Sequence, residues 1–120
     1  MDAVRVATGR QQLDYFVGVS GETCGSTGLS MHLVVLPPGA VADPHWHDGY
    51  ETAIYQVSGR VETRYGDRLS ESVVTEPGDF LFVPPGVPHQ AINLSETERA
   101  VAIIARNEAS EQERVVPYSP

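Results

Sequence analysis

HWHDGYE, residues 45–51, decides the fold of this chain together with a second segment, PPGVPH, that ends at His89. The first segment carries His45, His47 and Glu51. Alternate residues of a β-strand point to the same face, so a His-X-His pair directs two imidazoles toward one point. His89 and a carboxylate would complete a ligand shell there, and three nitrogens with one oxygen suit iron, manganese, nickel, copper or zinc.

Length and charge limit the classes of protein and of partner. A chain of 120 residues forms one domain with a hydrophobic core of its own, and it is too small for a separate cofactor domain. The formal net charge of -8 argues against the basic surface that binding to nucleic acid or to an anionic membrane requires. Small-molecule or protein partners therefore remain, and we expect neither nucleic acid nor membrane.

Several missing features exclude other locations and chemistries. No apolar run approaches the roughly twenty residues of a membrane span, and MDAVRVATGRQQ lacks the long apolar stretch of a signal peptide, so a cytoplasmic location is expected. Cys24 is the only cysteine, which excludes an intrachain disulfide and a thiolate-rich zinc site. The chain has no lysine for a Schiff base, and no phosphate-binding or nucleophile-elbow motif.

Short apolar or alternating runs, separated by Gly and Pro turns, are typical of an all-β sandwich or barrel. We predict strands at residues 14–19, 29–36, 51–57, 60–65, 69–74, 80–83, 89–93 and 99–106. Residues 18–28, rich in Gly, Ser and Thr, are predicted to be a flexible connection, with a lid over a pocket as the alternative. The only helix candidate is a short polar turn around residues 107–113.

Both histidine segments belong to longer patterns, through which the chain resembles the cupin superfamily. The first pattern covers residues 39–59 and runs from Gly39 through five residues to HWH, then to Glu51 and Gly59. The second covers residues 78–93 and includes Gly78, Pro84, Gly86, His89 and Asn93. The resemblance implies one cupin domain over residues 1–120, an all-β double-stranded β-helix (jelly-roll) barrel with flanking strands before and after the two patterns.

The same resemblance implies a metal site. Its ligands would be His45, His47, Glu51 and His89, holding one divalent transition metal per chain. Iron, manganese, nickel and zinc all fit this set, and iron is favoured. The flanking residue Asn93 is expected to support the shell or its strand by hydrogen bonding.

The first pattern departs from the family at one place. Seven residues rather than six separate Glu51 from Gly59, so counting back from Gly59 puts Thr52 in the ligand position. Threonine is a poor ligand for such metals beside a carboxylate. We therefore expect a one-residue slip or a bulge that leaves Glu51 facing inward.

Two further residues are of interest for catalysis. Tyr55 shares the strand parity of Glu51, so its hydroxyl would face the same pocket, and it is a candidate catalytic residue. His32 is predicted to be a buried, hydrogen-bonded core histidine, with a pocket-lining proton carrier as the alternative.

An open metal site inside a β-barrel leaves three functional classes. We favour a metalloenzyme acting on a small organic molecule by iron-dependent dioxygenase chemistry, because the metal activates both reactants and few proton-transfer groups are needed. The alternatives are a non-redox isomerase, lyase, decarboxylase or cyclase, and a non-catalytic binding or sensor protein. A homodimer is expected through apolar outer strands such as AVAIIA, residues 100–105, with help from residues 115–118.

Overall fold

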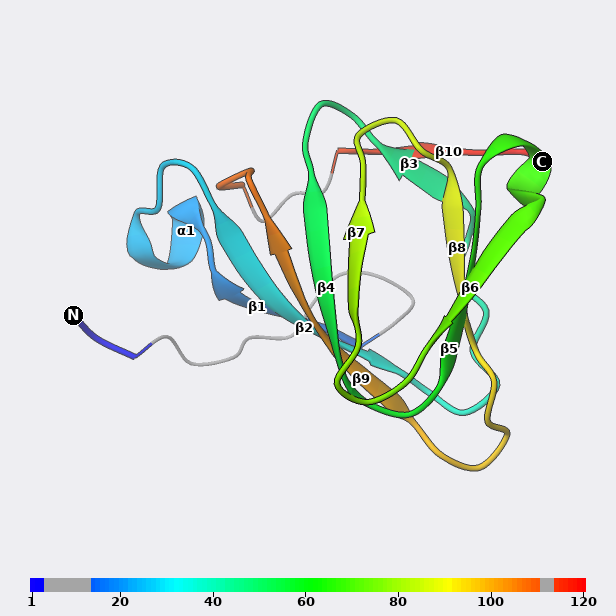
Figure 1. The fold of residues 1–120 in the computed structure, drawn as a ribbon. Coiled ribbons are helices and arrows are strands. Elements are labelled where there is room, and N and C mark those ends of the chain that lie inside the picture. Colours follow the sequence, from blue (N-terminus) through cyan, green and yellow to red (C-terminus); the bar gives the residue numbers. More distant parts are fainter. Residues whose placement is uncertain (4–13, 111–113) are drawn as a thin grey trace.

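Ten β-strands in two antiparallel sheets make up the part of the chain that the structure describes (Figure 1). The computed structural model describes residues 1–3, 14–110 and 114–120. The first sheet has the order β1-β2-β9-β4-β7, with β1 at Asp14–Val19, β2 at Ser30–Leu36, β9 at Ala100–Arg106, β4 at Thr52–Ser58 and β7 at Phe80–Val83. The second has the order β10-β3-β8-β5-β6, with β10 at Val115–Pro117, β3 at His45–His47, β8 at His89–Asn93, β5 at Val61–Tyr65 and β6 at Glu71–Thr75.

Alternating burial along the strands determines which side chains lie between the two sheets. In β2, His32 and Val34 are buried and Met31 is exposed. In β4, Thr52 and Gln56 are buried, and the residues between and beside them are less so. This period of two is what a sheet with one face turned to a core requires.

The predicted strands are confirmed, and three of them, β1, β7 and β8, have the predicted bounds. The other five differ by one or two residues at their ends. Two strands, β3 and β10, were not predicted, because each has only three residues and shows little alternation. No helix is present at residues 107–110, and residues 111–113 of the predicted polar turn lie outside the described residues.

The predicted flexible connection at residues 18–28 contains a short helix instead, α1 at Gly21–Cys24. Ser20 and Thr23 form a reciprocal capping box, in which each side chain accepts a hydrogen bond from the other's backbone N–H. Gly25 ends the helix in the left-handed conformation, with φ of 78°. The Ser and Thr residues that suggested flexibility therefore cap a helix. None of the helices in the described part of the chain is long and apolar enough to cross a membrane.

The hydrophobic core lies between the sheets and is concentrated where β2 ends and where β5 and β9 begin. Its buried members are Tyr15, Val17, Val34, Leu36, Val61 and Ala100. Gly59, in the turn before β5, has φ of 81°, and a Cβ atom there would lie 2.7 Å from the Cα of Ala100. Only glycine fits this close approach, which explains its place at the end of the first sequence pattern.

Candidate metal centre

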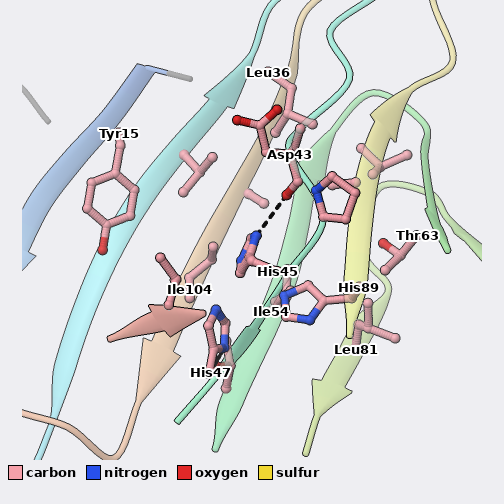
Figure 2. Close-up of a pocket in the computed structure, with 18 of the residues that line it drawn as sticks. Tyr15, Leu36, Asp43, His45, His47, Ile54, Thr63, Leu81, His89 and Ile104 are labelled. Atoms are coloured by element: carbon pink, nitrogen blue, oxygen red, sulfur yellow. Dashed lines mark hydrogen bonds between the residues drawn. The ribbon is translucent and has the colours of Figure 1, made fainter. Parts of the chain in front are cut away.

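A cavity of about 650 Å³ opens between the two sheets, and several residues of the hydrophobic core line it. Most of its wall is aliphatic, as Leu36, Ile54, Leu81 and Ile104 illustrate in Figure 2. A volume of this size suits a small organic ligand. Three histidines from the second sheet lie together at one part of the wall, and other polar residues such as Tyr15 and Thr63 line it elsewhere (Figure 2).

His45, His47 and His89 bring one ring nitrogen each to within 4.8 Å of the other two. His45 and His47 share a face of β3 because one residue separates them, and His45 lies directly opposite His89 of β8. The ring centroids of His45 and His89 are 4.6 Å apart. Figure 2 shows the three rings turned toward a common space at the cavity wall. Three convergent imidazoles of this kind can hold a divalent metal ion.

Backbone carbonyls fix the tautomer of two of these histidines. Nδ1 of His45 lies 2.9 Å from the carbonyl oxygen of Asp43, and Nδ1 of His89 lies 2.9 Å from that of Val87. A carbonyl oxygen only accepts, so each Nδ1 carries the hydrogen and donates it. The lone pair of each neutral ring is therefore on Nε2, which is the nitrogen left for a metal.

His47 is oriented by a side chain rather than by the backbone. Its Nδ1 lies 3.1 Å from Oγ1 of Thr52, and its ring stacks on Tyr50 with centroids 4.9 Å apart. Its Nε2 is buried and has no hydrogen-bond partner among the described residues. A buried, unpartnered nitrogen next to two similarly directed imidazoles fits a metal ion, because coordination would satisfy its lone pair.

The electrostatic setting keeps two of the imidazoles neutral. Burial, followed by the neighbouring His89, His45 and Arg106, lowers the pKa of His47 to about 3. Burial also lowers the pKa of His89 to about 4, with His45 adding to the shift and the bond to Val87 opposing it. Both rings are therefore uncharged near pH 7, the form in which a histidine binds a metal.

Glu51 is not brought to the three histidines. Its side chain is exposed, and its backbone N–H donates to Oδ1 of Asn107 at 2.7 Å. The next residue, Thr52, is 1% exposed and faces the cavity, as counting back from Gly59 indicates. The expected bulge exists, but it lies between Gln56 and Ser58, so it leaves Thr52 rather than Glu51 facing inward.

Tyr55 follows Glu51 to the outer face, as shared parity requires. Its ring packs against Phe80 with centroids 4.8 Å apart, and 37% of the residue is exposed. It does not line the cavity, so the geometry offers its hydroxyl no route to a ligand there. Its proposed parity with Glu51 holds, although both side chains lie on the side opposite to the one expected.

His32 is buried as predicted, with 1% of the residue exposed. Its ring stacks on Tyr15 with centroids 5.0 Å apart. The predicted hydrogen bond is missing, since neither ring nitrogen has a hydrogen-bond partner among the described residues. His32 does not line the cavity, so the geometry does not favour the alternative role as a pocket-lining proton carrier.

Asn93 supports strand ends rather than the histidines. Its Nδ2 donates to the carbonyl oxygens of Leu36, Pro37 and Glu98, and its Oδ1 accepts from the N–H of Ser95. These bonds join the end of β8 to the end of β2 and to the approach to β9. Of the two expected roles, support of the strand is the one that the contacts show.

Arg106 and Thr52 line the cavity but were not assigned to the site from the sequence. Thr52 was set aside because it is a poor ligand, although the spacing from Gly59 marked its position. Arg106 ends an otherwise apolar strand and shares strand parity with Ala102 and Ile104, which also line the cavity. That parity was the signal that this arginine faces inward.

The comparisons with known proteins agree with this architecture. The Cupin domain family matches residues 32–105. Germin-like protein subfamily T member 3 of Arabidopsis thaliana is 32% identical over 87 residues, which cover 70% of this chain and 38% of the plant protein. Germin-like protein 3-1 of Oryza sativa subsp. japonica is 30% identical over 95 residues, which cover 77% of this chain and 42% of that protein. The chain thus spans about two fifths of the length of these plant relatives.

A third relative carries a name that points to an enzyme. Ribosomal protein uL16 3-hydroxylase of Escherichia coli is 33% identical over 76 residues, which cover 48% of this chain and 20% of that protein.

Solved structures with low sequence identity share the fold. KdgF from Halomonas sp. aligns with a TM-score of 0.71 at 20% identity, covering 89% of this chain and 88% of that one. A Klebsiella pneumoniae protein with a double-stranded β-helix domain aligns with a TM-score of 0.73 at 16% identity, covering 94% of this chain and 91% of that one. Oxalate decarboxylase from Bacillus subtilis aligns with a TM-score of 0.74 at 19% identity, covering 98% of this chain and 29% of that one. With the family match over more than half of its length, this jelly-roll chain belongs to the cupin family.

Proposed function

We propose that this cupin is a metalloenzyme in which His45, His47 and His89 hold one divalent transition metal, with iron favoured, and that it oxidises a small organic molecule with dioxygen. The single observation that carries the proposal is the convergence of three ring nitrogens within 4.8 Å at the wall of the cavity. A redox-active iron there would bring the organic substrate and dioxygen together and exchange single electrons with them.

In this function the chain's own residues would hold the imidazoles, exclude water and leave room for the ligand. The carbonyls of Asp43 and Val87 and the hydroxyl of Thr52 hold the imidazoles in place. The aliphatic wall excludes water from the reacting groups and leaves room for an organic ligand. Because Glu51 is not brought to the histidines, three protein ligands leave more open positions than four would.

The name of the Escherichia coli relative, a hydroxylase, supports the oxidative chemistry over the other classes. The positions of two acid or base candidates support it too, because Tyr55 and His32, which were singled out in the sequence, do not line the cavity. An isomerase or lyase requires such a group beside the substrate.

Elemental analysis of protein purified without added metal tests the proposal, followed by oxygen-electrode measurements with a panel of small enols and diols. We expect about one iron per chain and substrate-dependent oxygen uptake. Zinc or nickel without oxygen uptake would favour the non-redox class, and no stoichiometric metal would favour a binding protein.

His47→Ala is the variant that tests the metal site. It should lose most of the bound metal and remain folded, because the hydrophobic core does not include His47. His32→Leu, which changes the one histidine outside the cluster, serves as the matched control and should keep its metal. An unfolded His47→Ala protein would indicate a structural metal instead of a catalytic one.

We also propose that two chains pair as a homodimer, but through a different surface from the one expected. AVAIIA forms β9, the central strand of its sheet, and β10 pairs with β3 of its own chain. The outer face of the same sheet at β4 and β7 exposes large apolar side chains instead: Tyr55, Val57, Phe80 and Phe82. β7 is also an edge strand, which favours pairing with a second copy.

A further inference from the structure

One buried hydroxyl on the cavity wall makes no hydrogen bond to the part of the chain that the structure describes. It belongs to Thr63, in the middle of β5, which lines the cavity and is 7% exposed. Figure 2 shows its oxygen turned toward the cavity. Burial removes such a hydroxyl from bulk water and, without a partner, returns no hydrogen bond in exchange. The hydroxyl is therefore open to a ligand.

The other side-chain hydroxyls that line the cavity already take part in hydrogen bonds within the protein: those of Tyr15, Thr52, Thr75 and Tyr118. Thr75 is the best comparison, because it is 6% exposed and also lines the cavity from the second sheet. Its hydroxyl donates to Oε1 of Gln56 at 3.3 Å. A ligand can thus bond to the hydroxyl of Thr63 without breaking a bond inside the described part of the protein.

Packing alone does not account for this hydroxyl. Val61 holds the next inward position of β5 and belongs to the hydrophobic core. A valine has the same branched shape as a threonine, so it would fill position 63 without burying a polar atom. The residues paired with Thr63 are Ala91 of β8 and Val73 of β6, and neither side chain has a polar group to offer.

Thr63 lies within reach of a molecule that also binds the metal. On β8, His89 lies opposite Tyr65 and Ala91 lies opposite Thr63. His89 and Ala91 share a face of β8, and both line the cavity. A strand rises about 3.3 Å per residue, so the two positions are about 7 Å apart along β8. A small organic molecule spans such a distance within the cavity.

We propose that Thr63 is a substrate-binding residue, and hence that the substrate carries an uncharged oxygen, a hydroxyl or a carbonyl, several bonds away from the group that binds the metal. This inference rests on the proposed metal function and specifies its substrate class. A threonine hydroxyl both donates and accepts, so it suits either kind of oxygen. The apolar side chains of Val61 and Ala91 beside it disfavour a charged group, which they would leave unsolvated.

Binding of paired catechols tests the inference without turnover. Protein reconstituted with Fe(II) and kept free of oxygen is titrated in a calorimeter with two pairs of probes. One pair is 4-ethylcatechol and 4-(hydroxymethyl)catechol, and the other is 4-propylcatechol and 4-(2-hydroxyethyl)catechol. Within a pair the hydroxyls offered to the metal are the same, and a terminal methyl group is replaced by a hydroxyl. The ratio of the two dissociation constants in each pair isolates the contribution of that hydroxyl.

Thr63→Val should shift this ratio against the alcohol by about fivefold in at least one pair, as the loss of one hydrogen bond implies, while iron content stays at that of the unmodified protein. Thr63→Ser keeps the hydroxyl and should keep the ratio. Thr75→Val is the matched control, because its hydroxyl is already bonded to Gln56, and both ratios should stay unchanged. If Thr63→Val does not fold, Thr63→Ala decides, since it removes the same hydroxyl.

The outcomes separate the two proposals. Protein that takes up no stoichiometric iron would overturn the metal function, and the substrate class with it. Stoichiometric iron with ratios that stay unchanged in Thr63→Val, or in Thr63→Ala where that variant decides, would overturn the substrate class alone and leave the hydroxyl to bound water. An equal shift in Thr75→Val would also overturn it, because the effect would not be specific to Thr63.

Discussion

Each of the three histidines uses its Nδ1 in a hydrogen bond, which leaves Nε2 for a metal, and the three bonds are not equivalent. His45 and His89 donate to backbone carbonyls, so no substitution at Asp43 or Val87 removes the acceptor. His47 alone depends on a side chain, the hydroxyl of Thr52. Thr52 is therefore the residue through which mutation can alter the orientation of a ligand without removing it.

Replacing Thr52 should lower or raise the affinity for the metal, depending on the new side chain. Thr52→Val keeps the shape and removes the hydroxyl, so we expect the dissociation constant for Fe(II) to rise by about tenfold. Thr52→Glu puts a carboxylate on the inward face of β4 beside the histidines, and a fourth ligand should lower the dissociation constant. Competition with a chelating dye measures both.

Two controls make this comparison specific. Thr63→Val removes a different hydroxyl from the cavity wall and should leave the affinity unchanged. Glu51→Gln should also leave it unchanged, because that side chain is exposed. A loss of metal in Glu51→Gln equal to that in His47→Ala would restore Glu51 as a ligand and contradict the account of β4 given above.

His32 should make the stability of the protein depend on pH. Burial, with a further contribution from Arg106, lowers the pKa of His32 from 6.5 to about 4, while Glu22 opposes the shift. Between these two pH values the unfolded chain binds a proton that the folded chain does not, so the free energy of unfolding falls as the pH drops from 6.5 to 4.

Denaturation by urea at several pH values, compared with His32→Leu, isolates this contribution. The variant lacks the buried imidazole, so its free energy of unfolding should fall less steeply between pH 6.5 and 4. His47 and His89 titrate in both proteins and cancel in the difference. Parallel curves for the two proteins would show that His32 is not held neutral by its surroundings.

Individual elements show what the sequence could predict and what it could not. Strands of four or more residues were placed within two residues, because alternation or a continuous apolar run marks them. β3 and β10 are three residues long, and they form because they pair with each other and because His45 pairs with His89. Such short strands depend on tertiary contacts that no local pattern reveals.

Strand β4 explains why the site was predicted only in part. The three histidines could be predicted from spacing, since two share a strand face and the third follows a rigid Pro-Gly turn. Which side of β4 faces inward depends on where its bulge lies relative to Gly59. The bulge lies at residues 56–58, and the side chain that faces the cavity is therefore that of Thr52. Chemical preference for a carboxylate ligand pointed to Glu51, but strand register decides which side chain faces the cavity.

Asn93 joins three elements, so its loss should affect stability and not the metal site. Asn93→Ala removes one NH2 group that is shared among three carbonyl oxygens and one acceptor of an N–H, and it takes the donor away from the buried carbonyl of Leu36. We expect the free energy of unfolding to fall by about 2–4 kcal/mol, as judged from about 1 kcal/mol per net hydrogen bond plus the penalty for unsatisfied groups.

Chemical denaturation and metal content, measured on the same samples, check this expectation. Asn107→Ala is the control, because it removes a single exposed bond to the N–H of Glu51 and should cost less than about 1 kcal/mol. Folded Asn93→Ala protein should bind the same amount of iron as the unmodified chain. A selective loss of iron would assign Asn93 to the metal shell.

Across the whole molecule, the two faces of the first sheet have different tasks. The inner face of β4 and β9 lines the cavity with Thr52, Ile54 and Arg106. The outer face at β4 and β7 exposes a cluster of apolar side chains, with Phe80 80% and Phe82 56% exposed. Exposed apolar patches of this kind are among the features that mark interaction surfaces, and the proposed homodimer would cover this one. The same sheet would then carry substrate on one face and a second chain on the other.

Light scattering tests whether that second chain is a copy of this one. We expect a mass of twice 13.0 kDa for the unmodified protein and of one chain for Phe80→Glu, because burying a phenylalanine contributes about 1.5–3 kcal/mol and a buried unpaired carboxylate opposes association. Val41→Glu, at an exposed apolar residue outside this patch, should leave the mass doubled. A mass of one chain before any substitution would refute the homodimer. A doubled mass for Phe80→Glu would show that the dimer interface lies elsewhere on the surface.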